Sequence, residues 1–103
     1  MDKPVFTYIW EYEVSPENHT EFARHYGPNG TWADLFRRAD GYVSTVLCRD
    51  REKPNRFVTL DTWESAEAHA AFCEAFASEY DRLDKECESL TNRENALGYF
   101  DYV

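Results

Sequence analysis

The feature that most constrains the fold is a run of ten residues, VFTYIWEYEV, at positions 5–14. Its side chains alternate with the two-residue period of a β-strand. One face is aromatic or aliphatic throughout and consists of Phe6, Tyr8, Trp10, Tyr12 and Val14. The opposite face begins apolar, at Val5 and Ile9, and ends acidic, at Glu11 and Glu13. A strand that is apolar on both sides for half its length predicts a sheet that is covered on both faces.

Two helices are predicted after this strand. The first begins at Ser15-Pro16-Glu17, where serine caps, proline fits the first turn and the acid lies near the positive helix end. It ends at Gly27-Pro28. The second is short, with Thr31 as its N-cap and Gly41 as its C-terminal cap. Its buried face is Trp32, Leu35, Phe36 and Ala39. Three of the four glycines of the chain surround this helix, and we interpret it as one wall of a pocket.

The rest of the chain completes a known order of elements. Residues 42–49 and 56–64 read as two strands joined by a charged loop. A helix follows from Ser65, with an apolar stripe that runs from His69 to Leu90 and a break near Ala77–Ser78, and residues 97–103 form a last strand. This is the α+β, ferredoxin-like βαββαβ order, which builds an antiparallel four-stranded sheet. We expect residues 1–103 to form a single domain.

Composition excludes several classes of function. The net charge of −9 comes from 20 acidic and 11 basic residues, which argues against nucleic-acid and anionic-membrane partners because both require a basic face. No apolar run approaches the roughly 20 residues of a membrane helix, and the N-terminal residues do not resemble a signal peptide. The three cysteines read as reduced thiols, with Cys73 and Cys87 buried on the helical stripe. We therefore expect a cytoplasmic protein.

Three stretches carry a resemblance to a known family. The run YGPNGTWADLFRRADGY, the later run FVTLDTWESAEAHAAF and the terminal LGYF resemble the antibiotic biosynthesis monooxygenase-like family of the dimeric α/β-barrel superfamily. The resemblance covers residues 5–102. It implies a homodimer whose two sheets pack face to face into a barrel, with a ligand pocket between the helices and the sheet of each subunit. Independently, the apolar second strand face, which holds Val5, Ile9, Val58 and Leu60, indicates a partner.

The predicted site lies on the helix-facing side of the sheet. Family geometry turns Trp63 toward the helices, and Tyr8, Trp10 and Tyr12 of the first strand would face the same way. Alternation puts Asp61 on the face of Trp63, where a buried carboxylate is costly unless paired. We expect a salt bridge from Asp61 to an arginine, the alternative being a functional role. Trp32, Phe36 and Phe72 complete the predicted substrate-binding set, although Trp32 could instead be a packing anchor.

His69 is the candidate catalytic residue. It lies on the apolar stripe one turn into the helix that begins at Ser65 and is expected to point at the sheet. A buried histidine beside aromatic rings can act as a general base near neutral pH. The alternative is a hydrogen-bonded core histidine. His19 occupies a similar place on the first helix, and His25 is expected in solvent.

The resemblance implies a cofactor-independent monooxygenase. Such an enzyme oxidises a polycyclic aromatic substrate such as an anthrone with O₂, and the substrate supplies the electrons. The protein provides an apolar slot, a base (His69) and a hydrogen-bond donor for the developing oxyanion, from Tyr8, Tyr12 or a tryptophan. The alternative is a non-catalytic small-molecule-binding or dimerisation domain. Haem degradation is disfavoured, because two residues of the haem-degrading branch are missing: an asparagine in the first strand and a haem-ligating histidine about ten residues after Trp63, for which His69 comes one turn too early. The chain also lacks the ligand spacings of a metal site, so no cofactor is expected.

Overall fold

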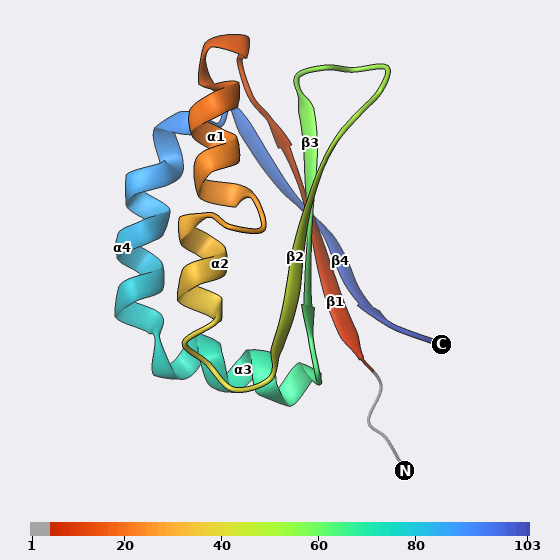
Figure 1. Cartoon of the computed structure of the whole chain (residues 1–103), viewed down its shortest axis with the longest axis vertical. Coiled ribbons are helices and arrows are strands. Elements are labelled where there is room, and N and C mark those ends of the chain that lie inside the picture. The colour runs from red at the N-terminus through yellow and green to blue at the C-terminus, as the bar shows by residue number, and fades with distance from the viewer. Residues whose placement is uncertain (1–4) are drawn as a thin grey trace.

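A computed structural model of the protein describes residues 5–103. Four strands form one antiparallel sheet in the order β2-β3-β1-β4. All the helices of the described chain lie on one side of this sheet, as Figure 1 shows. The α+β ferredoxin-like architecture is thereby confirmed. The elements are β1 (Phe6–Glu13), η1 (Pro16–Asn18), α1 (His19–Tyr26), α2 (Thr31–Phe36), β2 (Tyr42–Arg49), β3 (Arg56–Trp63), α3 (Ala66–Ala75), α4 (Ala77–Cys87), η2 (Glu88–Leu90) and β4 (Arg93–Asp101).

The core lies between the helices and the sheet. Alternation along β1 buries Phe6, Tyr8 and Tyr12 beneath the helices, and the register pairs them with the buried Trp63, Asp61 and Phe57 of β3. Burying a large apolar side chain stabilises the fold by about 1.5–3 kcal/mol. The ring-rich helix face therefore holds the helices on the sheet, and the predicted orientation of β1 and Trp63 is confirmed.

The other face of the sheet carries no helix in the described chain (Figure 1). Ile9 of β1 pairs with Leu60 of β3, which pairs with Val46 of β2, so these three side chains form one row across that face. Val46 is 47% exposed, and Phe100, opposite Thr7, is 46% exposed. An apolar surface is therefore left without cover.

The boundaries of α2 differ from the prediction. Its N-cap is Gly30, not Thr31, whose hydroxyl instead lies 2.7 Å from Nδ1 of His25. His25 is accordingly largely buried rather than solvated. The helix ends at Phe36, and Gly41 lies in the later turn into β2 with a φ of +90°. A Cβ at Gly41 would come within 2.6 Å of the Cβ of Ala68, so glycine also allows the turn to pack closely on α3.

The C-terminal half brings two confirmations and two corrections. The helix breaks at Phe76, next to the predicted position, which separates α3 from α4. The last strand begins at Arg93 rather than Leu97, because polar side chains pair along it: Asn95 donates a hydrogen bond to Glu11 over 3.1 Å. Cys87 is buried as predicted, whereas Cys73 is exposed. No helix within residues 5–103 is both long and apolar enough to cross a membrane.

Candidate functional site

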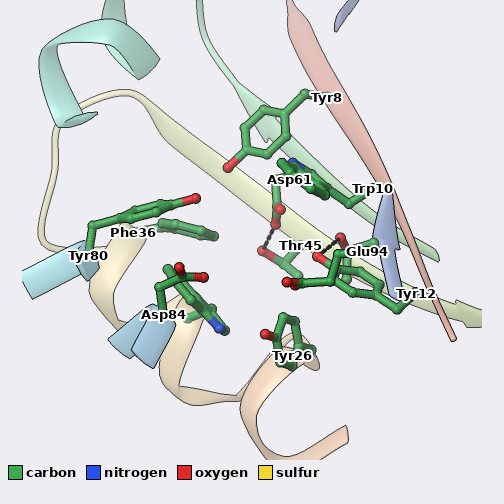
Figure 2. Close-up of a pocket in the computed structure, with 12 residues that line it drawn as sticks. Tyr8, Trp10, Tyr12, Tyr26, Phe36, Thr45, Asp61, Tyr80, Asp84 and Glu94 are labelled. Carbon is green, nitrogen blue, oxygen red and sulfur yellow. Dashed lines mark hydrogen bonds between the residues drawn. The ribbon is translucent and has the colours of Figure 1, made fainter. Parts of the chain in front are cut away.

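A cavity of about 210 Å³ lies between the sheet and helices α1, α2 and α4. Every strand and these three helices contribute to its wall, so it depends on the whole fold. Seven of its twelve lining residues are aromatic, and Figure 2 shows their arrangement around the opening. The lining consists of Tyr8, Trp10, Tyr12, Tyr26, Trp32, Phe36, Thr45, Thr59, Asp61, Tyr80, Asp84 and Glu94.

Asp61 is the buried carboxylate of the cavity. Its side chain comes from β3, is 6% exposed and accepts a 2.6 Å hydrogen bond from the Thr45 hydroxyl on β2. The predicted salt bridge is wrong, since no arginine or lysine of the described chain pairs with it. Burial raises the pKa of Asp61 to about 6, and the Thr45 hydrogen bond only partly opposes this. Asp61 can therefore exchange a proton near neutral pH.

Tyrosine hydroxyls supply the hydrogen-bond donors of the cavity. Burial, together with the nearby Asp61 carboxylate, raises the pKa of Tyr8, and burial likewise raises the pKa of Tyr12. Both phenols therefore keep their protons at neutral pH. The Tyr12 hydroxyl lies 3.1 Å from the Thr59 hydroxyl, whereas the Tyr8 hydroxyl has no hydrogen-bond partner within residues 5–103. Tyr8 is thus a free donor beside a buried carboxylate, and its hydroxyl points into the space in Figure 2.

The predicted binding residues separate into two groups. Six of them line the cavity, namely Tyr8, Trp10, Tyr12, Trp32, Phe36 and Asp61. Trp63 and Phe72 do not; their rings pack against the far side of Phe36, with centroid separations of 5.8 and 5.3 Å. Leu35 also turns away from the cavity, into a groove between α2 and α4. Trp63 and Phe72 therefore support the cavity wall without reaching the space inside it.

His69 lies behind the wall as well. Its ring packs 4.6 Å from the Tyr8 ring and 5.4 Å from the Trp63 ring, measured between centroids. Its Nε2 is 3.5 Å from Sγ of Cys73. Partial burial lowers the pKa of His69, which keeps the imidazole neutral at pH 7. His69 touches a cavity residue, Tyr8, but is not itself part of the lining.

Sequence reasoning missed six of the lining residues, which come from helices α1 and α4 and from strands β2, β3 and β4: Tyr26, Thr45, Thr59, Tyr80, Asp84 and Glu94. Asp84 follows Tyr80 by one helical turn on α4, so the spacing could have shown that both share a face. Thr45 and Thr59 could have been found from the alternation that identified Asp61. Glu94 could not, because it lay outside the predicted last strand. Within residues 5–103 no group of three or more His, Cys, Asp or Glu side chains is arranged to hold a metal ion.

Comparison with known proteins places the chain in a family. The sequence profile of the antibiotic biosynthesis monooxygenases matches residues 5–77, well over half of the chain. The chain belongs to this family. The resemblance seen in the sequence is thus confirmed. The matched region contains nine of the twelve residues that line the cavity and ends before the other three, Tyr80, Asp84 and Glu94. A comparison with curated proteins gave no match.

Solved structures of this family share the fold. SnoaB, a cofactor-independent oxygenase from Streptomyces nogalater, is 21% identical over 98% of this chain and 95% of its own, with a TM-score of 0.72. A candidate antibiotic biosynthesis monooxygenase from Bordetella bronchiseptica is 19% identical over 98% and 99% of the two chains, with a TM-score of 0.75. One from Nitrosomonas europaea is 13% identical over 100% and 94%, with a TM-score of 0.74. At these identities the likeness concerns the fold alone.

Proposed function

We propose that this protein is a cofactor-independent monooxygenase that oxidises a small aromatic molecule of the anthrone type with O₂ inside the aromatic cavity. The observation that carries the proposal is Asp61, a carboxylate buried in a ring-lined cavity without a cationic partner. A non-catalytic binding pocket has no need of such a group, whose burial is costly. Family membership and the fold shared with the oxygenase SnoaB support the same reaction class.

Asp61 is the base in this proposal, in place of His69. A general base must be within hydrogen-bond reach of the proton it removes, and Asp61 lines the cavity whereas His69 lies behind Tyr8. A base works best when its pKa is close to the working pH, and that of Asp61 is about 6. His69 then has a positioning role, since its ring contacts the Tyr8 ring.

The reaction follows from these groups. Asp61 removes a proton from the methylene carbon of the anthrone, and the Tyr8 hydroxyl donates a hydrogen bond to the developing enolate oxygen. The enolate transfers an electron to O₂, and the two radicals combine to form a carbon–oxygen bond. The resulting hydroperoxide loses its remaining carbon-bound proton, its O–O bond breaks, and quinone and water are released. One O₂ is consumed for each quinone and water formed, so no external reductant is needed.

Oxygen uptake with anthrone tests the function and the base together. We expect Asp61→Asn to lower kcat/KM by about 100- to 10,000-fold, as loss of a general base does, and His69→Ala to lower it much less. The wild-type rate should rise as the pH passes through about 6, because Asp61 must be ionised. Asp81→Asn, an exposed carboxylate on α4 outside the cavity, is the control.

The outcomes separate the alternatives. Activity that survives Asp61→Asn but is lost in His69→Ala would return the role of base to His69. Absence of oxygen uptake, with anthrone bound, would indicate a non-catalytic binding domain instead.

We also propose that the whole chain, residues 1–103, acts as one domain within a homodimer. The uncovered face of the sheet supports this, since Ile9, Leu60 and Val46 form an apolar row across it. A second copy packed sheet to sheet would cover that row, as in the barrel that the family resemblance implies.

A further inference from the structure

The cavity is acidic as well as aromatic. Three of its twelve lining residues are carboxylates, Asp61, Asp84 and Glu94, and none is a lysine, arginine or histidine among the described residues. They come from three different elements, β3, α4 and β4. In Figure 2 all three side chains reach toward the same space. This clustering of like charge is unfavourable in the empty protein, because no cation of the described chain compensates it inside the cavity.

Asp84 and Glu94 lie nearer to solvent than Asp61. Both are exposed residues, whereas Asp61 is buried. Partial burial raises the pKa of Glu94, and the charge of Asp84 raises it further, so the two carboxylates act on each other across the opening. Neither makes an ion pair with a described residue. A ligand cation placed between them would relieve this repulsion.

The rings around these carboxylates suit a cation and a flat aromatic body. Electron-rich faces of tryptophan and tyrosine attract cations, and cavities of this kind recognise organic ammonium groups. Trp10, Tyr12 and Tyr80 lie around the same opening in Figure 2. The Tyr8 hydroxyl, on a side chain only 7% exposed, has no described partner and is free to bind a ligand oxygen.

We propose that the substrate is an arylalkylamine, an aromatic ring system that carries an alkylammonium group, whose protonated nitrogen lies between Asp84 and Glu94, with its ring system inside the cavity beside Asp61 and Tyr8. The proposal rests on the proposed function only in taking this cavity as the substrate site. It assigns Asp84 and Glu94 to substrate recognition and leaves Asp61 for proton transfer. The carboxylates that line the cavity disfavour a substrate that itself carries a carboxylate, because none of the described lining residues is a cation that could pair with it.

Binding of three matched probes to the wild-type protein tests the proposal. Naphthylmethylamine, naphthalenemethanol and naphthoate have similar rings and differ in charge, and their affinities can be measured by calorimetry at neutral pH. We expect the amine to bind about tenfold or more tightly than the alcohol, as one or two charge-assisted contacts would give, and the carboxylate to bind weakest. Equal affinities, or tightest binding of the carboxylate, would overturn the proposal.

Two double variants test whether Asp84 and Glu94 supply the negative charge that binds the amine. Asp84→Asn with Glu94→Gln should lower amine affinity about tenfold while leaving alcohol affinity unchanged. Asp81→Asn with Glu88→Gln removes the same net charge from exposed positions outside the cavity, and should change neither. Equal loss of amine affinity in both double variants would mean that only overall charge matters, which contradicts the assignment.

Turnover separates this inference from the proposed function. An amine that binds through Asp84 and Glu94, while no aromatic probe supports oxygen uptake, would leave the recognition site standing and remove the monooxygenase. Oxygen uptake with neutral anthrone, together with no preference for the amine probe, would support the monooxygenase and overturn the assignment of Asp84 and Glu94 to substrate recognition.

Discussion

At the scale of the residue, Asp61 combines a chemical advantage with a cost to stability. A carboxylate held at a pKa of about 6 is ionised at neutral pH while buried among rings. The folded protein therefore binds a proton more tightly than the unfolded chain does. Between pH 4 and pH 6 the unfolded chain holds less of this proton, so Asp61 lowers the free energy of unfolding as the pH rises. Such a group is typical of a site where activity is retained at the expense of stability.

This gives a prediction with a definite sign. Each pH unit between the unfolded and folded pKa corresponds to about 1.4 kcal/mol, and burial raises the pKa of Asp61 from its ordinary value of 3.8 to about 6. Asp61→Asn should therefore be up to about 3 kcal/mol more stable, relative to wild type, at pH 7 than at pH 4. Urea unfolding of both proteins at the two pH values measures this difference. A difference that does not change with pH would contradict the buried, ionised state of Asp61.

Asp50 provides a control of opposite sign. Backbone N–H groups of Glu52 and Lys53 donate to its carboxylate, and they hold the pKa of Asp50 below its usual value. Its stabilising contribution is present above the unfolded pKa and is lost as the pH falls through the folded pKa. Asp50→Asn should therefore lose stability, relative to wild type, as the pH rises.

At the scale of the element, the apolar side chains of α2 face two different parts of the molecule. Trp32 and Phe36 line the cavity, whereas Leu35 faces the groove beside α4. Trp32→Ala should weaken binding of a flat aromatic ligand by about 1–3 kcal/mol, because a stacking surface and apolar contact are lost. Leu35→Ala, on the same helix, should lower the melting temperature without changing affinity. Calorimetry of both folded variants distinguishes the roles, and an unchanged affinity in Trp32→Ala would make Trp32 a packing anchor only.

The strands and helices could be predicted because the periodicity of apolar side chains depends only on residues close together in the sequence. The alternation from Phe6 to Tyr12 predicted which face of β1 lies under the helices, and the stripe from His69 predicted the third and fourth helices with their break. The site was less predictable, because a cavity depends on how separate elements meet. The sequence analysis did not single out Asp84 or Glu94, and only the folded arrangement of α4 and β4 brings them to one opening. His69, on α3, lies behind Tyr8 rather than in the cavity.

At the scale of the whole molecule, the sheet has one covered and one uncovered face. Figure 1 shows every described helix on a single side, so the aromatic core and the cavity occupy one face of the sheet. The opposite face holds the row of Ile9, Leu60 and Val46. A second copy would turn this exposed row into an interior, and the cavity on the far face would stay open to ligand.

The proposed homodimer gives the last prediction. Light scattering at micromolar concentration should report twice the mass of one chain, because an obligate sheet-to-sheet interface buries about 2,000 Å² or more in total. Val46→Glu places a charge at the β2 end of the apolar row and should give monomers, since an unpaired charge cannot be buried there without a large cost. Ala71→Glu adds the same charge at an exposed position of α3, on the helix side, and should leave the dimer intact. A wild-type monomer, or a dimer that survives Val46→Glu but not Ala71→Glu, would place the interface elsewhere and leave the apolar row without a partner.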